Sequence, residues 1–389
     1  MNEKNINTNK TSKSIVLIAN TSWYLYNFRK ELISDLKAKG YDIYIISPED
    51  SYSKHLIKIS HKKLDWKLNR SSLNIFNEII SVLDLINKLR EINPILIHNF
   101  TIKGSIYGSL AAYFTGNPII INSITGLGHL FISNSFHIKL IRFIILPLLK
   151  IIFYFTNSKF IFQNYDDQNL FIKKGIINKK DSIVIKSSGV NTNFFKPEKR
   201  IKNDKYTILF PARIIKEKGI NELLMACKSL WNKGFKFTLY IAGDIDPGNR
   251  SSLSKEEFST IRRNPNIKCF GHIKNMKKIY NLSDLVVLPS WREGLSRTLL
   301  EASSMEKAII TTNVPGCRDL INHNKNGLLV NLKDFKDIER RILFLYKNRK
   351  IAAKFGKEAR IRAINKFDVN IINSQTISFY SNFMKEDIM

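Results

Sequence analysis

Short strand-like runs alternate with helix-length amphipathic segments along this chain, and this alternation is the strongest constraint on its fold. KSIVLIAN, FRKELISDLKAKG and YDIYIIS follow one another near the amino terminus, and PILIHNF and PIIINSI come later. Strands that are separated by helices predict a parallel sheet covered by helices on both faces. We therefore expect the first half of the chain to form a doubly wound α/β domain.

The alternation pauses at residues 193–205, a charged stretch with a proline and no periodicity, which we interpret as a linker. Strand-like runs then resume, and the chain from Asp334 to Met384 is helical without a strand signal. A chain of 389 residues, 44% of them apolar, is long enough for two cores. The expected units are a loose tail over residues 1–13, doubly wound domains over 14–195 and 196–365, and a C-terminal helix over 366–389 that can cross back to the first domain.

Composition limits the compartment and the partners. Three widely spaced cysteines suggest neither a disulfide framework nor a zinc site, and the polar amino terminus lacks the apolar core of a signal peptide. We therefore expect a cytoplasmic protein. The formal net charge of +29 favours a nucleic acid, an anionic membrane surface or a phosphorylated substrate as partner. Because Lys, Asn and Ile are abundant in every segment, composition alone also explains the charge.

The most apolar stretch of the chain is residues 136–160, which Lys139, Arg142, Lys150 and Lys159 interrupt. It falls short of the roughly 20 apolar residues that are needed to span a bilayer. Two interpretations stay open: a helix that lies in the membrane interface, and a buried helix with a basic exposed edge.

The first candidate motif is FPARIIKEKGINELL, residues 210–224, which follows a strand and leads into a helix. Arg213 and Lys218 lie in the connecting loop, where two cations suit a diphosphate: Arg binds it bidentately and Lys acts as a point charge. The alternative interpretation is that the basic residues of this loop are solvated surface charges.

The second candidate motif is PSWREGLSRTLLEA, residues 289–302, with a helix expected to start near Leu295 or Ser296. Gly294 lets a ligand approach the backbone, and the first amides of the helix are donors for an anion. Glu301 then lies about 8–9 Å along the helix, close to the separation of a ribose from the far phosphate of a nucleoside diphosphate. Glu293 lies on the opposite, sugar-bearing side. In the alternative interpretation, Glu293 is a loop acid and Glu301 pairs with Arg297 four residues earlier.

These motifs, with a PGC turn at Pro315–Cys317 and an NGLLV strand at residues 326–330, resemble the retaining GT-B glycosyltransferases of family 4. The resemblance covers roughly residues 206–375. NTSWYLYNFRKELI at residues 20–33 and SITGLGHLF at 123–131 are similar to bacterial enzymes that extend polyprenyl-diphosphate-linked sugars.

The resemblance implies a GT-B fold of two Rossmann-like domains and assigns roles to residues. Arg213 and Lys218 would hold the donor diphosphate, Glu293 the transferred sugar and Glu301 the ribose, with Glu293, Arg213 and Lys218 as the catalytic set. The implied donor site also includes Gly271, His272 and Ile273 near the base, and Gly294, Leu295, Ser296 and Arg297 near the phosphates. The implied acceptor site comprises Asn20, Thr21, Ser22, Trp23, Thr125, Gly126 and Gly128.

The sequence departs from the family at two places. Many members have a Gly-Gly pair where this chain has Asn20–Trp23, and many have a histidine where Ser123–Thr125 stand. The usual histidine contact with the transferred sugar is therefore unassigned. His98 and His129 are near in sequence, with core or loop histidines as the alternative interpretation.

The expected activity is transfer, with retention, of an N-acetylhexosamine from a UDP-sugar to a polyprenyl-diphosphate-linked saccharide in surface polysaccharide or glycoprotein glycan assembly. The expected enzyme needs no metal or other cofactor and associates peripherally with the inner face of the cell membrane. A GT-B transferase with a soluble or polysaccharide acceptor is the alternative. A nucleic-acid-binding protein is a remote alternative, because the charge is spread along the chain without a nucleic-acid module. UDP-galactose, UDP-glucose and a GDP-sugar stay open as donors.

Overall fold

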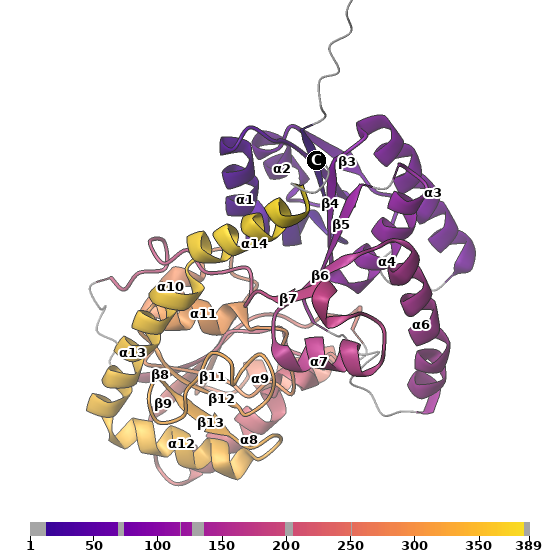
Figure 1. Ribbon diagram of the computed structural model, residues 1–389. Coiled ribbons are helices and arrows are strands. Elements are labelled where there is room, and N and C mark those ends of the chain that lie inside the picture. Colours follow the sequence, from indigo (N-terminus) through magenta and orange to yellow (C-terminus); the bar gives the residue numbers. More distant parts are fainter. Residues whose placement is uncertain are drawn as a thin grey trace, which may run out of the picture. The chain divides into compact units, whose positions relative to one another are not determined.

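A computed structural model describes residues 13–68, 74–116, 118–126, 136–198, 205–249 and 251–384, with the side chains of residues 136–141 and 144 left out. The chain forms two compact units, each built on its own sheet (Figure 1). Unit 1 comprises Met1–Phe162, Gln168–Ile183 and Thr376–Met389, and unit 2 comprises Gln163–Asp167 and Val184–Gln375.

The sheet of unit 1 has the strand order β3-β2-β1-β4-β5-β6-β7. Its strands are β1 (Ser14–Ile18), β2 (Asp42–Ser47), β3 (Lys62–Asp65), β4 (Leu96–Phe100), β5 (Ile119–Ile124), β6 (Lys159–Phe162) and β7 (Ser182–Val184). The pairs from β3 through β6 are parallel. Every residue of β1 and β4 is buried, which explains why neither run shows the alternation of a strand with one solvent-facing side. The strand order changes direction between β1 and β4.

The helical elements along this half of the chain are α1 (Ser22–Ala38), α2 (Ser53–Ile59), α3 (Ile75–Ile92), α4 (Thr101–Tyr113), α6 (Phe136–Phe155), α7 (Tyr165–Lys173) and η1 (Lys179–Asp181). Helix α1 begins where the Thr21 hydroxyl accepts a hydrogen bond from the Tyr24 amide, as N-cap residues do. Helix α4 packs against both α3 and α6.

The sheet of unit 2 is parallel and has the order β10-β9-β8-β11-β12-β13. Its strands are β8 (Tyr206–Phe210), β9 (Phe237–Ala242), β10 (Ile267–Gly271), β11 (Leu285–Leu288), β12 (Ala308–Thr312) and β13 (Leu328–Val330). The strand order changes direction between β8 and β11. In doubly wound sheets such a switch point marks the crevice at the carboxyl ends of the strands, where ligands bind.

The helical elements along this half are η2 (Lys216–Lys218), α8 (Ile220–Asn232), α9 (Lys255–Arg262), α10 (Met276–Leu282), α11 (Arg297–Ser304), α12 (Phe335–Lys347), α13 (Arg349–Phe367) and α14 (Val369–Met384). The last three confirm the expected helical end of the chain. Two doubly wound parallel sheets confirm the expected fold class.

The structure places the change of unit between Ile183 and Val184, where the sequence suggested residue 195, and assigns Gln163–Asp167 to unit 2. The end of α14 belongs to unit 1, where the Tyr380 hydroxyl contacts Nδ1 of His98. Among the helices of the described residues, none combines the length and the hydrophobicity that crossing a lipid bilayer requires.

Candidate functional site

The candidate donor residues follow strands of unit 2 at the carboxyl edge of its sheet. Lys218 lies in the connection after β8, and Glu293 lies in the connection after β11, the strand beside β8 at the switch point. Nζ of Lys218 is 2.5 Å from Oε1 of Glu293, and both side chains are largely buried. The switch point therefore joins a cation and a carboxylate that are 75 residues apart in the sequence.

Backbone contacts hold these two connections together. Gly219, with φ of +75°, ends η2, and a Cβ atom on it would lie 2.1 Å from the Pro289 carbonyl oxygen. The Trp291 amide donates a hydrogen bond of 2.8 Å to the Glu217 carbonyl, which also accepts one of 3.1 Å from the Ser290 hydroxyl. Because this approach leaves no room for a side chain, the glycine that follows Lys218 in the first motif is a steric requirement.

A third connection supports the Glu293 backbone. Gly316 follows β12 with φ of +77°, and a Cβ atom there would lie 2.4 Å from the Glu293 carbonyl oxygen. The Glu293 amide donates a hydrogen bond of 3.3 Å to the Pro315 carbonyl. The PGC turn is thus in contact with the Glu293 loop, although its sequence carries no charged group of its own.

Arg213 also follows β8, and its Nη1 is 2.5 Å from Oδ2 of Asp246, which follows β9. Its side chain is 55% exposed, so its guanidinium is accessible to a ligand. Gly271 ends β10 with φ of +65°, and His272 and Ile273 follow it at the same edge of the sheet. The structure therefore places the predicted diphosphate contacts after β8 and the predicted base contacts after β10, with β9 between these two strands.

Helix α11 begins at Arg297, with Ser296 as its N-cap in extended backbone conformation. This start is one residue later than the latest position that the sequence suggested. Within the described chain, the backbone N–H groups of Leu295 and Ser296 have no hydrogen-bond acceptor. Such amides at a helix start suit an anion.

Glu301 is a partly buried residue of α11 with two partners. Its Oε1 accepts from Nε of Arg297 at 3.1 Å, and its Oε2 accepts from the Tyr280 hydroxyl at 3.3 Å. Burial raises the pKa of Glu301, and the charge and hydrogen bond of Arg297 act in the opposite direction. Arg297 also donates to the Gly189 carbonyl. The pair four residues apart in the alternative interpretation is present, but its side chains are only 15% and 13% exposed.

The candidate acceptor residues lie in unit 1, and several have structural partners. Asn20 and Thr21 follow β1, and Thr21 caps α1. Ser22 is fully buried, with its hydroxyl 2.8 Å from the Ser47 hydroxyl and 3.0 Å from the Ser53 hydroxyl. The Trp23 amide donates to Asp50, and its side chain is 37% exposed. Trp23 is thus more accessible to a ligand than Ser22.

Thr125 and Gly126 follow β5, at the same carboxyl edge of the unit 1 sheet as the end of β1. Gly126 has φ of +151°. Gly128 and His129 lie outside the described residues.

His98 is a fully buried residue of β4 in unit 1. Its Nε2 is 2.6 Å from the Ser123 hydroxyl, and its Nδ1 contacts the Tyr380 hydroxyl. Burial holds the pKa of His98 well below its usual value, and the nearby Arg29 guanidinium lowers it further. These contacts fit the core-histidine interpretation, and they put His98 beside one of the residues that replace the family histidine.

A group of residues that supports the Glu293 loop was not predicted from the sequence. Asn164 donates through Nδ2 to the Gly294 carbonyl at 2.7 Å, and its Oδ1 accepts from the Asp167 amide at 2.8 Å. Asp167, with a side chain only 1% exposed, forms an ion pair with Arg292. Burial raises the pKa of Asp167, and Arg292 opposes this shift. Asn164 and Asp167 lie more than a hundred positions before Gly294 and Arg292 in the chain, so no local sequence pattern connects the two segments.

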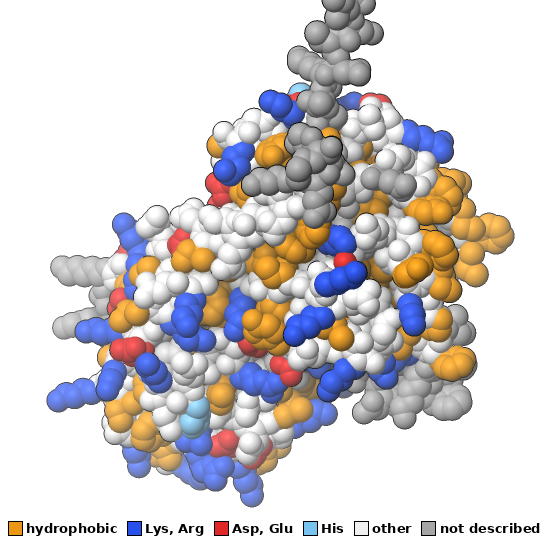
Figure 2. Space-filling view, in the orientation of Figure 1, with side chains coloured by type: hydrophobic (Ala, Val, Ile, Leu, Met, Phe, Trp, Pro, Cys, Tyr) orange, Lys and Arg blue, Asp and Glu red, His pale blue; other side chains and the backbone are white. Residues whose placement is uncertain are grey.

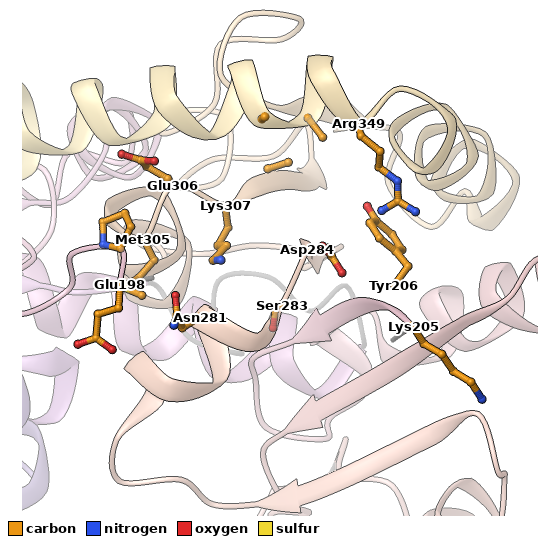
Figure 3. A pocket seen from close by; sticks show the side chains of 14 residues that line it. Glu198, Lys205, Tyr206, Asn281, Ser283, Asp284, Met305, Glu306, Lys307 and Arg349 are labelled. Carbon is orange, nitrogen blue, oxygen red and sulfur yellow. The ribbon is translucent and has the colours of Figure 1, made fainter. Parts of the chain in front are cut away.

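A cavity of about 500 Å³ lies at the opposite edge of the unit 2 sheet (Figure 3). Its lining includes Tyr206 at the start of β8, Asp284 just before β11, and Arg349, whose guanidinium lies 3.4 Å from the centre of the Tyr206 ring. None of the candidate donor or acceptor residues lines it. Because ligands of doubly wound sheets bind at the carboxyl ends of strands, this cavity is separate from the candidate site.

Comparisons with known proteins show which families this chain is similar to. The family model described as "Glycosyl transferases group 1" matches residues 191–362, and the one described as "Glycosyl transferase 4-like" matches residues 14–164. The chain is 26% identical to the capsular polysaccharide biosynthesis glycosyltransferase CapM of Staphylococcus aureus, over 91% of this chain and 93% of CapM.

Two further proteins are similar over nearly the whole chain. The N,N'-diacetylbacillosaminyl-diphospho-undecaprenol alpha-1,3-N-acetylgalactosaminyltransferase of Campylobacter jejuni is 28% identical, over 93% of this chain and 96% of that protein. The crystal structure of Anabaena HepE in complex with UDP and glucose has a TM-score of 0.75 at 18% identity, over 94% of this chain and 99% of that one. At this identity, the similarity to HepE is a similarity of fold.

Proposed function

Because this chain belongs to the GT-B glycosyltransferases, we propose that it moves a sugar from a UDP-sugar to a polyprenyl-diphosphate-linked saccharide, with retention of configuration, in surface polysaccharide, O-antigen, capsule or glycoprotein glycan assembly. The observation that carries the proposal is the pairing of Lys218 with Glu293 at the switch point of unit 2. The acceptor class rests on relatives that are similar over almost the whole chain, one named for capsule biosynthesis and one for an undecaprenol diphosphate.

In the proposed donor complex, the diphosphate replaces carboxylates as the partner of two cations. Lys218 is now paired with Glu293, and Arg213 with Asp246. A diphosphate carries more charge than one carboxylate, so it competes effectively for both cations. The amides of Leu295 and Ser296 supply further donors at the start of α11. Glu293, released from Lys218, then accepts hydrogen bonds from hydroxyls of the transferred sugar.

Glu301 is proposed to accept hydrogen bonds from the ribose. Arg297 and the Tyr280 hydroxyl each contact one of its oxygens, so they fix the orientation of the carboxylate. A carboxylate oxygen accepts more than one hydrogen bond, which leaves capacity for ribose hydroxyls. Gly271, His272 and Ile273 follow β10 and are proposed to contact the base.

The proposed reaction is a front-face displacement. The bond between the anomeric carbon and the diphosphate oxygen breaks, the acceptor oxygen bonds to the same face of that carbon, and the acceptor proton moves to the departing diphosphate. Arg213, Lys218 and the α11 amides stabilise the negative charge as it develops on the leaving group. No protein nucleophile is needed in this scheme, in contrast to the carboxylate pair of retaining hydrolases. The proposal includes no metal ion.

The acceptor is proposed to contact Asn20, Thr21, Trp23 and Thr125–Gly126 at the carboxyl edge of unit 1. The N-acetylhexosamine donor is proposed from the name of the Campylobacter jejuni relative. A peripheral position on the inner, anionic face of the cell membrane would bring the enzyme to a lipid-linked acceptor, and the basic helix α6 fits such a surface.

The test is a panel of UDP- and GDP-sugars incubated with polyprenyl-diphosphate saccharides and with soluble saccharides, followed by release of the nucleoside diphosphate. We expect release that depends on a lipid-linked acceptor and is fastest with a UDP-N-acetylhexosamine. Nuclear magnetic resonance of the product should show the anomeric configuration of the donor. Transfer to the soluble acceptors alone would overturn the acceptor class in favour of the alternative transferase.

A further inference from the structure

We propose that the outer face of α3 is a second membrane-binding surface, which inserts into the interface of an anionic bilayer beside α6. The inference rests on the proposed function, because it concerns how a transferase with a lipid-linked acceptor reaches its substrate. Five large apolar side chains on α3 are strongly exposed: Ile75 72%, Phe76 75%, Ile79 51%, Ile80 50% and Leu83 54%. We call these five residues the α3 patch.

The α3 patch occupies one side of the helix. Its positions follow the spacing i, i+1, i+4, i+5 and i+8, which a period of 3.6 residues places on one face. The other face is buried through Leu85, Ile86 and Leu89. Helix α3 is apolar on both faces, but only one face is buried. An exposed apolar face of this kind is typical of an interaction surface.

The α3 patch is one part of a larger apolar surface of unit 1. Helix α4 packs against both α3 and α6, and residues at its end, Tyr113 and Phe114, are exposed. Helix α6 exposes Phe143, Tyr154 and Phe155, at 78%, 77% and 64%. Figure 2 shows hydrophobic side chains gathered along the edge of unit 1 where Figure 1 places α3 and α6. Large apolar side chains are thus exposed on neighbouring helices of unit 1.

The charges near this surface favour a lipid bilayer as its binding partner. The sequence of α6 contains Lys139, Arg142 and Lys150 and no acidic residue. Beside the α3 patch, Glu78 is paired with Lys103 at 3.0 Å and also accepts from the Tyr107 hydroxyl, so its charge is compensated. Exposed aromatic residues interleaved with basic ones match the boundary between anionic headgroups and acyl chains. A second copy of the chain would place one basic α6 against another, which like charges oppose.

The dimensions of the α3 patch fit shallow insertion. From Ile75 to Leu83 the helix advances about 12 Å. This is far less than the hydrocarbon thickness of about 30 Å. Helix α3 would thus lie in the plane of the interface, with the apolar side chains reaching the acyl boundary.

The experiment measures binding of the full chain to vesicles of phosphatidylcholine with and without phosphatidylglycerol, by sedimentation. We expect the triple variant Phe76→Ser/Ile79→Ser/Leu83→Ser to partition into anionic vesicles about tenfold less than the wild type, because three apolar anchors are lost. The control is Met225→Ser/Ile361→Ser, which changes side chains of unit 2 that are 51% and 52% exposed, and it should bind like the wild type.

A second readout does not depend on loss of binding. Brominated lipids should quench the fluorescence of a Phe76→Trp variant more than that of a Met225→Trp variant. Wild-type partition of the triple variant, or equal quenching of the two tryptophan variants, would overturn the proposal. A change of the triple variant from dimer to monomer in light scattering, with vesicle binding unchanged, would identify a second copy as the occupant and also overturn it.

The same variants separate this inference from the proposed function. If the triple variant loses vesicle binding and transfer to a lipid-linked acceptor but keeps transfer to a short-chain, water-soluble analogue, both proposals are supported. If vesicle binding falls while no lipid-linked acceptor is ever used, the proposed function fails and the α3 patch stands as a membrane surface.

Discussion

Lys218 and Glu293 each have a partner in the structure that the donor complex would replace. Their ion pair of 2.5 Å joins two of the motifs that the sequence singled out. The ion pair neutralises both side chains and holds them near each other at the switch point. At the scale of single residues, the interesting question is which of the two is needed for chemistry and which for binding.

We expect Glu293→Ala to lower the rate of transfer by about 100-fold or more, because interactions that strengthen in the transition state are of this size. UDP should bind at least as tightly as it does to the wild type, since Lys218 then has no competing carboxylate. Initial rates and isothermal titration calorimetry with UDP measure the two effects. Glu91→Ala, which changes a carboxylate that is 64% exposed, serves as the control. Unchanged turnover would remove Glu293 from the catalytic role.

The buried position of His98 predicts how the free energy of unfolding depends on pH. Burial holds its pKa in the folded state well below the ordinary value of 6.5, so in acid the unfolded chain binds a proton that the folded chain does not. The free energy of unfolding should therefore fall as the pH drops below 6.5, by up to about 1.4 kcal/mol per pH unit from this group. Urea unfolding at pH 7.0, 6.0 and 5.0 should show a smaller loss for His98→Gln, whose amide does not titrate. Parallel curves for the two proteins would contradict the assignment.

At the scale of elements, glycines and a short supporting segment decide how the loops of unit 2 meet. Gly219 and Gly316 let the connections after β8 and β12 lie against the backbone at the end of β11. The segment Gln163–Asp167 supports the same loop through Asn164 and Asp167. The Glu293 loop is thus held by elements from three places in the sequence.

Gly316→Ala should separate the effect of close packing from the effect of the backbone angle. Its Cβ atom would lie 2.4 Å from the Glu293 carbonyl oxygen, so the loop must move. We expect a loss of transfer of tenfold or more, because small misplacements of a site cost this much. Gly234→Ala is the matched control: φ is +84° there, but no atom lies within 4 Å of the new Cβ. Similar activity losses in both variants would argue against the packing explanation.

Asp167→Asn should act through the loop without contact with the donor. It leaves the Arg292 guanidinium without its buried carboxylate, which costs about 3 kcal/mol of unfolding free energy when one partner of a buried pair is removed. We expect lower kcat with little change in the affinity for UDP, because Asp167 holds the residue next to Glu293. The exposed pair offers the control, since Asp166→Asn removes the 42%-exposed partner of Arg318. A variant with wild-type kcat and reduced stability would limit Asp167 to a structural role.

In the molecule as a whole, the candidate residues for the two substrates belong to different units. The donor candidates lie in unit 2 and the acceptor candidates in unit 1, each set at the carboxyl edge of its own sheet. This distribution suits a transferase that must recognise a nucleotide and a lipid-linked saccharide by different surfaces. The α3 patch belongs to unit 1, the unit of the acceptor candidates.

We expect transfer to continue in the presence of EDTA. Arg213, Lys218 and the α11 amides are proposed to carry the charge stabilisation of the departing diphosphate, which in other transferases a divalent cation supplies. The measurement is the initial rate after dialysis against chelator, with Mg²⁺ and Mn²⁺ added back to parallel samples. A rate that is lost on chelation and restored by either ion would assign a metal to the leaving group.

The fold class and the order of the motifs could both be predicted from the sequence. Both depend on local patterns: strand and helix periodicity, and charged or glycine residues just after a strand. Parallel strands bring such turns to one edge of a sheet, so Arg213, Lys218 and Glu293 were expected near one another without knowledge of their contacts.

The partner of each side chain, by contrast, became known from the three-dimensional structure. It paired the partly buried Glu301 with Arg297 and Tyr280, put His98 in the core against Tyr380, and brought Asp167 to Arg292. It also left the α3 patch uncovered. Periodicity shows that a helix face is apolar, but whether another element covers that face depends on packing between distant segments, which no local pattern records.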